Sequence, residues 1–154
     1  MNTNSEDYKI DRISYKIGMI NCFVEMVACG VKKLALSPPV SPEDYEVISV
    51  LSEKIVNGFG INSYLEESLI ITDLQSEDFT RGKWSIIYYD DHEVLENYFE
   101  LKKKQKLLID SGKYDKKERQ ELSANFMRLL SYPEEKINNI LNRIKPESPY
   151  LIEN

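Results

Sequence analysis

Apolar side chains in the N-terminal part of the chain recur at alternating spacings of three and four residues, from Ile10 to Leu34. This repeat is typical of an α-helix with one continuous apolar stripe, and it predicts a long helix over residues 7–35. Between Ile17 and Val31 the other faces are also largely apolar. We therefore expect the middle of this helix to be surrounded by other elements or by a second copy of the chain.

Polar capping residues followed by amphipathic runs mark the starts of four further helices. Proline and acidic residues in the first turns support these starts, and glycines support the ends. The predicted helices begin near Pro42, Asp91, Asp115 and Pro133, and the last one ends before Pro146.

Two short runs rich in β-branched and aromatic residues, 68–74 and 84–89, predict the strands of a small hairpin. We therefore expect a mainly α fold: a single-domain helical bundle of about five helices over residues 1–146, with a two-stranded β-hairpin. Residues 147–154 are expected to form a C-terminal tail. An α+β fold is the alternative, because a short apolar run is also compatible with a buried helical turn.

Length and charge describe an ordinary soluble chain of 154 residues with 26 acidic and 20 basic side chains and a net charge of −6. The first nine residues lack the features of a secretory signal, and no apolar run reaches the ~18 residues of a membrane span. These observations predict a cytoplasmic protein that does not enter a membrane. Frequent Lys, Ile and Asn with scarce Ala indicate the codon bias of a prokaryotic genome rich in A and T.

Cys22 and Cys29 are seven residues apart. On one helix their Cα atoms are separated by roughly 10 Å along the axis, which is too far for a disulfide. We expect two buried free thiols, and no zinc site, because the chain contains one histidine.

That histidine, His92, lies in an acidic stretch, with Asp91 beside it and Glu96 one helical turn further on. A histidine with a carboxylate can bind a divalent metal ion or act as a general base. Acidic residues at a helix start are also ordinary capping groups, so no cofactor is the first expectation. If a metal is bound, the candidates are Mg²⁺ or Mn²⁺ held by Glu25, Asp91, His92 and Glu96.

A stripe of small and polar residues on the first helix contains Asn21 and Glu25, between faces that are apolar. A carboxylate in apolar surroundings is costly unless it has a partner. The stripe is the solvated side of the helix, or Glu25 has a structural partner, or Asn21 and Glu25 line a ligand pocket.

Two further groups are candidates for ligand binding. The turn Arg81-Gly82-Lys83 offers two cations to an anion, although its glycine spacing is not that of a P-loop. Tyr88 follows the single tryptophan, Trp84, and belongs either to the core or to a rim of hydroxyl groups around a pocket or dimer contact.

A basic segment from Lys102 to Arg119, with eight bases and three acids, follows the acidic residues 61–101. Acids early and bases late in one helix match the helix dipole. Anion or RNA binding by this segment is the alternative. Because the segment contains one aromatic residue and no nucleic-acid-binding motif, we do not expect binding to nucleic acid.

None of these patterns fixes a reaction, and whether the protein is an enzyme stays open. The expected function is that of an interaction module, homodimeric through the first helix or the hairpin region, with a second copy, another protein or a small molecule as partner. The first alternative is a small metal-dependent hydrolase that uses carboxylates near Glu25 and His92. The second is the binding of an anion or RNA by the basic segment.

Overall fold

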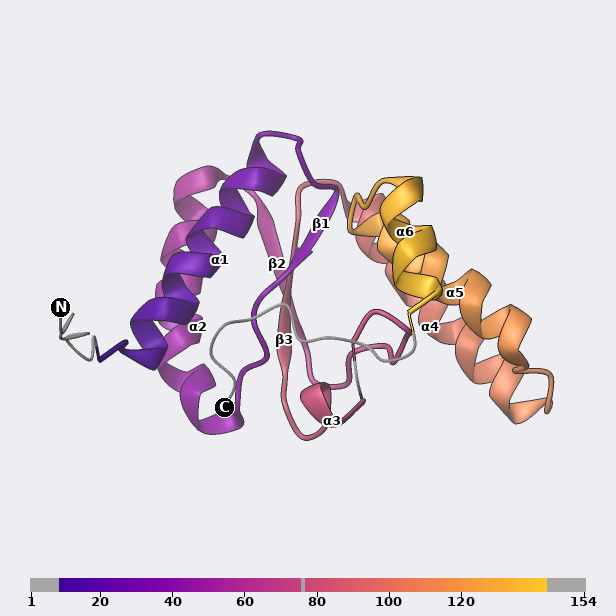
Figure 1. Ribbon diagram of the computed structural model, residues 1–154. Helices are drawn as coiled ribbons and strands as arrows, with labels where there is room; N and C mark the ends of the chain where they lie inside the picture. Colours follow the sequence, from indigo (N-terminus) through magenta and orange to yellow (C-terminus); the bar gives the residue numbers. More distant parts are fainter. Residues whose placement is uncertain (1–8, 76, 144–154) are drawn as a thin grey trace, which may run out of the picture.

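The computed structural model describes residues 9–75 and 77–143, and Figure 1 shows them as a small sheet between two layers of helices. The sheet has three antiparallel strands in the order β1-β3-β2. Their bounds are Leu34–Leu36 for β1, Asn62–Glu66 for β2 and Ser85–Tyr89 for β3. All five residues of β3 are buried, because this strand is central and covered on both faces.

Two helices, α1 (Arg12–Ala28) and α2 (Pro42–Phe59), cover one face of the sheet. Ile20, Val24 and Ile48 are inaccessible to solvent and pack in one cluster with Ile86 and Tyr88 of β3. The helices begin side by side, where the Arg12 guanidinium donates to the Asp44 carboxylate at 3.0 Å. This layer therefore rests on the β3 side chains at positions 86 and 88.

One lysine, Lys16, is buried on the inner side of α1. Its Nζ atom donates to the carbonyl oxygen of Pro39 at 3.0 Å and lies 3.8 Å from the Asp44 carboxylate. Burial lowers the pKa of this ammonium group, and the nearby Asp44 carboxylate opposes that shift.

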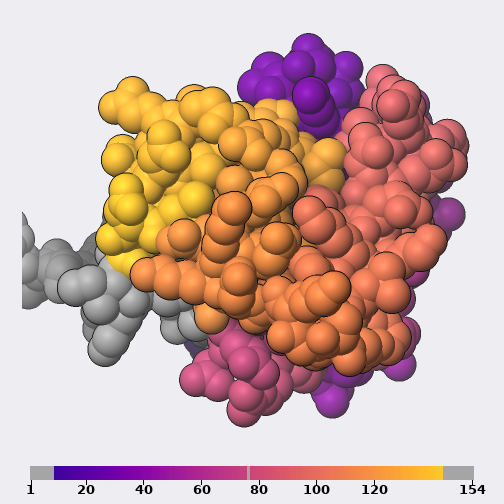
Figure 2. All heavy atoms as spheres, turned by 90° about the vertical axis from the view of Figure 1, so that its right-hand side faces the viewer, coloured from indigo at the N-terminus to yellow at the C-terminus, as the bar shows by residue number. Residues whose placement is uncertain are grey.

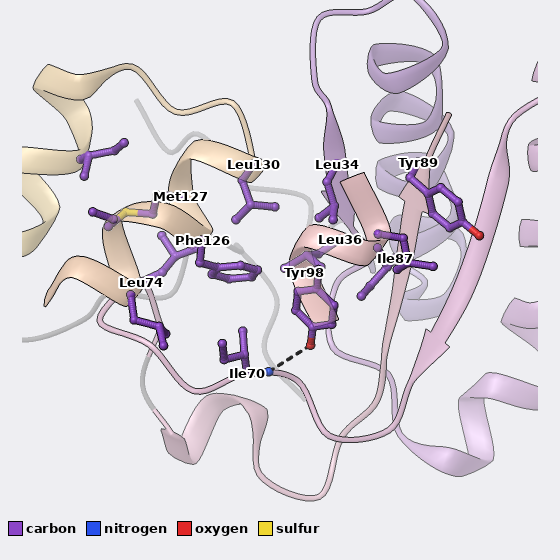
Figure 3. Packing of buried hydrophobic residues seen from close by; sticks show 14 of the residues in the cluster. Leu34, Leu36, Ile70, Leu74, Ile87, Tyr89, Tyr98, Phe126, Met127 and Leu130 are labelled. Atoms are coloured by element: carbon purple, nitrogen blue, oxygen red, sulfur yellow. Dashed lines mark hydrogen bonds between the residues drawn. The ribbon is translucent and has the colours of Figure 1, made fainter. Parts of the chain in front are cut away.

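Three helices, α4 (His92–Asp110), α5 (Lys116–Leu129) and α6 (Glu134–Leu141), lie on the opposite face. Figure 2 views the molecule from this side, with α4, α5 and α6 on the surface. Their inner side chains pack with Ile87 and Tyr89 of β3, and Figure 3 shows Tyr98 and Phe126 in the centre of this cluster. The side chains of β3 thus alternate between the two helical layers, with Ile86 and Tyr88 in one cluster and Ile87 and Tyr89 in the other.

The predicted fold class is confirmed: the chain is mainly helical with a small β element, in an α+β arrangement. Of the two expected strands, the one near 84–89 is present as β3. The sheet, however, has three strands, and the prediction missed β1, β2 and the short helix α3 (Glu77–Thr80).

The expected strand over residues 68–74 is wrong, because this run forms no strand. Its backbone groups bind to side chains of the helical layer instead of a neighbouring strand. The N–H of Ile70 donates to the Tyr98 hydroxyl at 3.2 Å, as Figure 3 shows, and the N–H of Asp73 donates to Ser123 Oγ at 2.9 Å. The apolar side chains Ile70 and Leu74 still enter the core. The run is therefore buried, as its composition indicates, without belonging to the sheet.

The first helix is shorter than predicted, ending at Ala28. Gly30 has a φ of +75°, a left-handed conformation that ends the helix, and Leu34 belongs to β1. Other elements of the chain do not surround the helix, because α1 lies in an outer layer and buries one stripe. Cover by a second copy stays a prediction. Cys22 and Cys29 are free but exposed, which corrects the prediction of buried thiols.

The helix starts derived from capping residues are confirmed. Ser41, Asp91 and Asp115 each accept a hydrogen bond from a backbone N–H of the first turn of α2, α4 and α5. Pro133 is the residue before α6. The expected tail over residues 147–154 and the stop at Pro146 lie outside the described residues.

Candidate functional site

The two candidate residues of the first helix, Asn21 and Glu25, are exposed to solvent on α1. They lie in the layer formed by α1 and α2, whereas His92 begins α4 in the opposite layer. The structure therefore does not bring Glu25 and His92 together.

The residues around His92 act as parts of the α4 start. Asp91 caps the helix by accepting from the N–H of Glu93 at 2.9 Å, and the His92 ring contacts the Tyr89 ring at a centroid distance of 5.4 Å. Glu96 is exposed. Within residues 9–75 and 77–143, no three His, Cys, Asp or Glu side chains are grouped closely enough to hold a metal ion.

The cations of the predicted turn are engaged in local contacts. Arg81 pairs with Glu77 at 3.1 Å and Asp78 at 3.7 Å, and the hydrogen bond with Glu77 raises the pKa of its guanidinium. Lys83 Nζ lies 5.3 Å from the centroid of the Phe79 ring. The two cations therefore do not stand free in the turn.

Tyr88 is fully buried in the core, and its hydroxyl oxygen lies 2.8 Å from Ser52 Oγ in a hydrogen bond. Burial raises the pKa of the phenol above its ordinary value. Tyr88 is therefore a core residue that cross-links β3 to α2.

Several bases of the segment from Lys102 to Arg119 pair with acidic residues, three of them outside the segment. The described ion pairs are Lys102–Glu66 at 2.9 Å, Lys104–Glu121 at 3.6 Å, Lys106–Asp110 at 2.8 Å and Arg119–Asp73 at 2.7 Å. Arg119 and Lys116 also line a cavity of about 470 Å³ that contains the Asp73 carboxylate. These pairs reduce the positive charge that the segment offers to an anion.

The feature that the sequence did not reveal is the contrast between the two edges of the sheet. At one edge, Leu34 is fully buried and Leu36 is 8% exposed, and two prolines without N–H groups, Pro38 and Pro39, follow β1. At the other edge, Ser63 and Tyr64 in the middle of β2 are exposed. Among residues 9–75 and 77–143, one edge is thus covered by the fold and the other is open.

The backbone groups of Ser63 and Leu65 point away from the sheet. The backbone groups of Trp84 and Ile86 point toward the β1 edge. The N–H of Ser37 donates to the carbonyl of Ile86, and the N–H of Trp84 donates to the carbonyl of Val40. Because the bonding side alternates along an antiparallel strand, Ser85, Ile87 and Tyr89 bond to β2. Their partners are Glu66, Tyr64 and Asn62. The N–H and C=O groups of Ser63 and Leu65 therefore face outward, and none has a hydrogen bond with a described residue.

The two faces of the sheet differ beside this edge. On the α2 side, a groove of about 390 Å³ runs between the helix and β2, lined among others by Glu53, Val56 and the side chains of Ser63 and Leu65. On the α4 side, the rings of Tyr64 and Phe99 meet edge to face at a centroid distance of 5.1 Å. Tyr64 is 39% exposed and Phe99 36% exposed.

A buried polar network fixes the end of β2 to α4. The Glu66 carboxylate accepts from the Tyr98 hydroxyl at 2.8 Å, from Lys102 Nζ at 2.9 Å and from the N–H of Ser68 at 2.9 Å. Burial, with the Glu66 charge as a second cause, raises the pKa of Tyr98. The open strand is therefore held rigidly to the helical layer.

The residues of the open edge were missed because Asn62–Glu66 has a weak strand pattern with polar residues on both faces. Gly60, which ends α2 with a φ of +71°, was the available signal that a new element follows. Phe99 lies one residue beyond the buried Tyr98 on α4, and nothing in the sequence relates it to Tyr64.

Comparison with models of protein families, with curated proteins and with solved structures finds no match to this chain. None of the described helices combines the length and apolarity required to span a membrane.

Proposed function

We propose that the protein is an interaction module that works as a homodimer in the cytoplasm. The observation that carries this proposal is the open edge of β2, which lies between an exposed pair of aromatic rings and a groove. Rows of unpaired backbone groups at a sheet edge are templates for pairing with another chain.

Monomeric proteins generally protect such edges with prolines, bulges or charged side chains, including charges that point inward. β2 pairs all five of its residues with β3 in continuous register and contains no proline. Its one charged residue, Glu66, is buried and bonded to Lys102. The charge of Glu66 is confined to the end of the strand, and the residues from Asn62 to Leu65 carry no proline and no charge, which favours an edge that is used.

Two exposed thiols support the assignment to the cytoplasm. Cys22 and Cys29 are both free and accessible on the α1 side. Exposed thiols persist in reducing compartments and are oxidised in secreted proteins.

Analytical ultracentrifugation of the full chain tests the homodimer. The experiment is run with a reducing agent, so that Cys22 and Cys29 do not cross-link two copies. We expect a species of twice the 18.0 kDa chain mass at micromolar concentration, dissociating on dilution. A mass of one chain throughout the micromolar range would contradict the proposal.

A further inference from the structure

We infer that the homodimer forms by antiparallel pairing of β2 with β2 of a second copy, about a two-fold axis at Tyr64. The two sheets then join into one of six strands. This inference rests on the proposed homodimer and names its surface.

The register follows from the outward backbone groups. A two-fold axis at Tyr64 places Ser63 of one copy opposite Leu65 of the other. Each such pair exchanges both of its N–H to C=O bonds, so four free donors and four free acceptors are satisfied. Tyr64 is the middle residue of β2, so this register pairs all five strand residues, whereas an axis at Ser63 or Leu65 leaves strand residues unpaired.

The side chains that meet in this register are compatible. Tyr64 of one copy faces Tyr64 of the other across the axis. The two form a non-hydrogen-bonded pair, in which the side chains of antiparallel strands lie closest. Asn62 faces Glu66, so no two like charges stand opposite each other. On the α4 side, the two Tyr64–Phe99 pairs meet as four rings, which removes from water the aromatic surface exposed on each copy.

The other face has room for the incoming strand. There Leu65 of the second copy lies opposite the small side chain of Ser63, beside the groove between α2 and β2. Leu65 is half-buried in one copy, so its remaining apolar surface is covered by the pairing.

The charges of α4 complement those of a second α4 in this arrangement. The two-fold axis brings the helices antiparallel with Phe99 near the centre, so the acidic first half of one helix lies beside the basic second half of the other. Glu96 and Lys103 are exposed charges about one helical turn before and after Phe99, and the exposed Glu100 lies between them. Neither is in an ion pair within the described part of the chain, so each is available to the second copy. The acid-to-base order of α4 therefore serves association as well as the helix dipole.

The first test replaces the outward N–H of Ser63. The variant Ser63→Pro removes a donor that the single copy does not use, and proline is tolerated at edge positions whose N–H faces solvent. The control Ser63→Ala keeps the donor. We expect Ser63→Pro to be monomeric with an unchanged circular dichroism spectrum, and Ser63→Ala to be dimeric. A folded Ser63→Pro variant that remains dimeric would overturn the inference.

The second test does not depend on whether proline is tolerated. Glu96→Lys and Lys103→Glu each place like charges at two symmetric contacts, and we expect each to weaken dimerisation about tenfold in Kd. The double variant restores opposite charges and is expected to restore the wild-type Kd. Equal weakening by the single and double variants, or no weakening by either single variant, would overturn the inference.

These outcomes separate the inference from the proposed function. A wild-type protein that is monomeric contradicts both. A wild-type dimer that persists in folded Ser63→Pro contradicts the surface inferred here and leaves the homodimer intact.

Discussion

Glu66, at the end of the open strand, is 4% exposed. Its buried carboxylate accepts three hydrogen bonds, which compensate for the loss of water around the charge. A buried charge is tolerated when its hydrogen bonds are made. Removing the carboxylate leaves its buried donors without an acceptor. The neighbouring Glu67 is exposed, so adjacent positions carry the same side chain in opposite environments.

We expect Glu66→Ala to lower the free energy of unfolding by roughly 2–4 kcal/mol, because the buried Tyr98 hydroxyl loses its acceptor. Glu67→Ala is the matched control and is expected to change it by about 0.5 kcal/mol or less. Urea denaturation followed by circular dichroism measures both. Equal effects of the two substitutions would contradict the network.

Tyr88 gives a pH dependence whose sign follows from its raised pKa. The phenol of the unfolded chain ionises near 10.0, whereas burial keeps the folded phenol protonated to higher pH. The folded state thus binds more protons above pH 10, so the stability from Tyr88 is complete below that pH and falls as pH rises further.

At pH 8, Tyr88→Phe is expected to lower the free energy of unfolding by about 1 kcal/mol, because the substitution removes the hydrogen bond with Ser52. Above pH 10 the free energy of unfolding of the wild type is expected to fall relative to that of the variant by about 1.4 kcal/mol per pH unit. Urea unfolding of both proteins from pH 8 upwards measures the difference. A constant difference across pH 10 would show that Tyr88 ionises equally in both states.

At the scale of elements, α1 shows how a surface helix can resemble a central one in sequence. Ile20, Val24 and Val27 face the sheet, whereas Cys22 and Met26 point to solvent. The periodicity identified the buried stripe correctly at Ile20, Val24 and Val27, whereas Ile10 and Val31 near its two ends are exposed. The number of layers around the helix is not encoded in its periodicity, since apolar residues on a solvated face leave the helix stable.

Truncation of side chains on the two faces of α1 is expected to destabilise the protein to different extents. Ile20→Ala is expected to lower the free energy of unfolding by roughly 2–4 kcal/mol, because it leaves a cavity in a fully buried site. Met26→Ala, at a site that is 37% exposed, is expected to cost about 0.5 kcal/mol or less. Thermal and urea unfolding compare them, and a similar loss for both would contradict the outer position of α1.

The exposed thiols give an independent check of this layer. Cys22 and Cys29 are expected to react with a thiol reagent in the folded protein at rates close to those in denaturant. A Cys22→Ser variant assigns one of the two reactive groups. Thiols that react only after denaturation would show that this face of α1 is covered.

At the scale of the whole molecule, most of the sheet could not be predicted from local sequence patterns. The helices were predicted because a cap and a periodic stripe lie within a few turns of each other, as in Ser41 and the residues after it. β1 and β2 pair with a strand at least 19 residues further along the chain. β1 has three residues and β2 has polar residues on both faces, so neither shows a strand pattern. Candidate chemistry was sought in charged residues, whereas the open edge consists of backbone groups and two rings.

The arrangement of two layers around a sheet with one open edge leads to a central claim, the pairing of β2 with a second copy at Tyr64. Direct proximity at that residue tests it most closely. In a Cys22→Ser/Cys29→Ser background, Tyr64→Cys places two thiols at the two-fold axis, where paired residues have Cα atoms about 4.5 Å apart, within disulfide range. Val50→Cys, which is exposed on α2, is the control.

Mild oxidation followed by gel electrophoresis without reducing agent is the measurement. We expect Tyr64→Cys to form a covalent dimer rapidly and Val50→Cys not to. Cross-linking of Tyr64→Cys no faster than that of Val50→Cys would contradict the pairing.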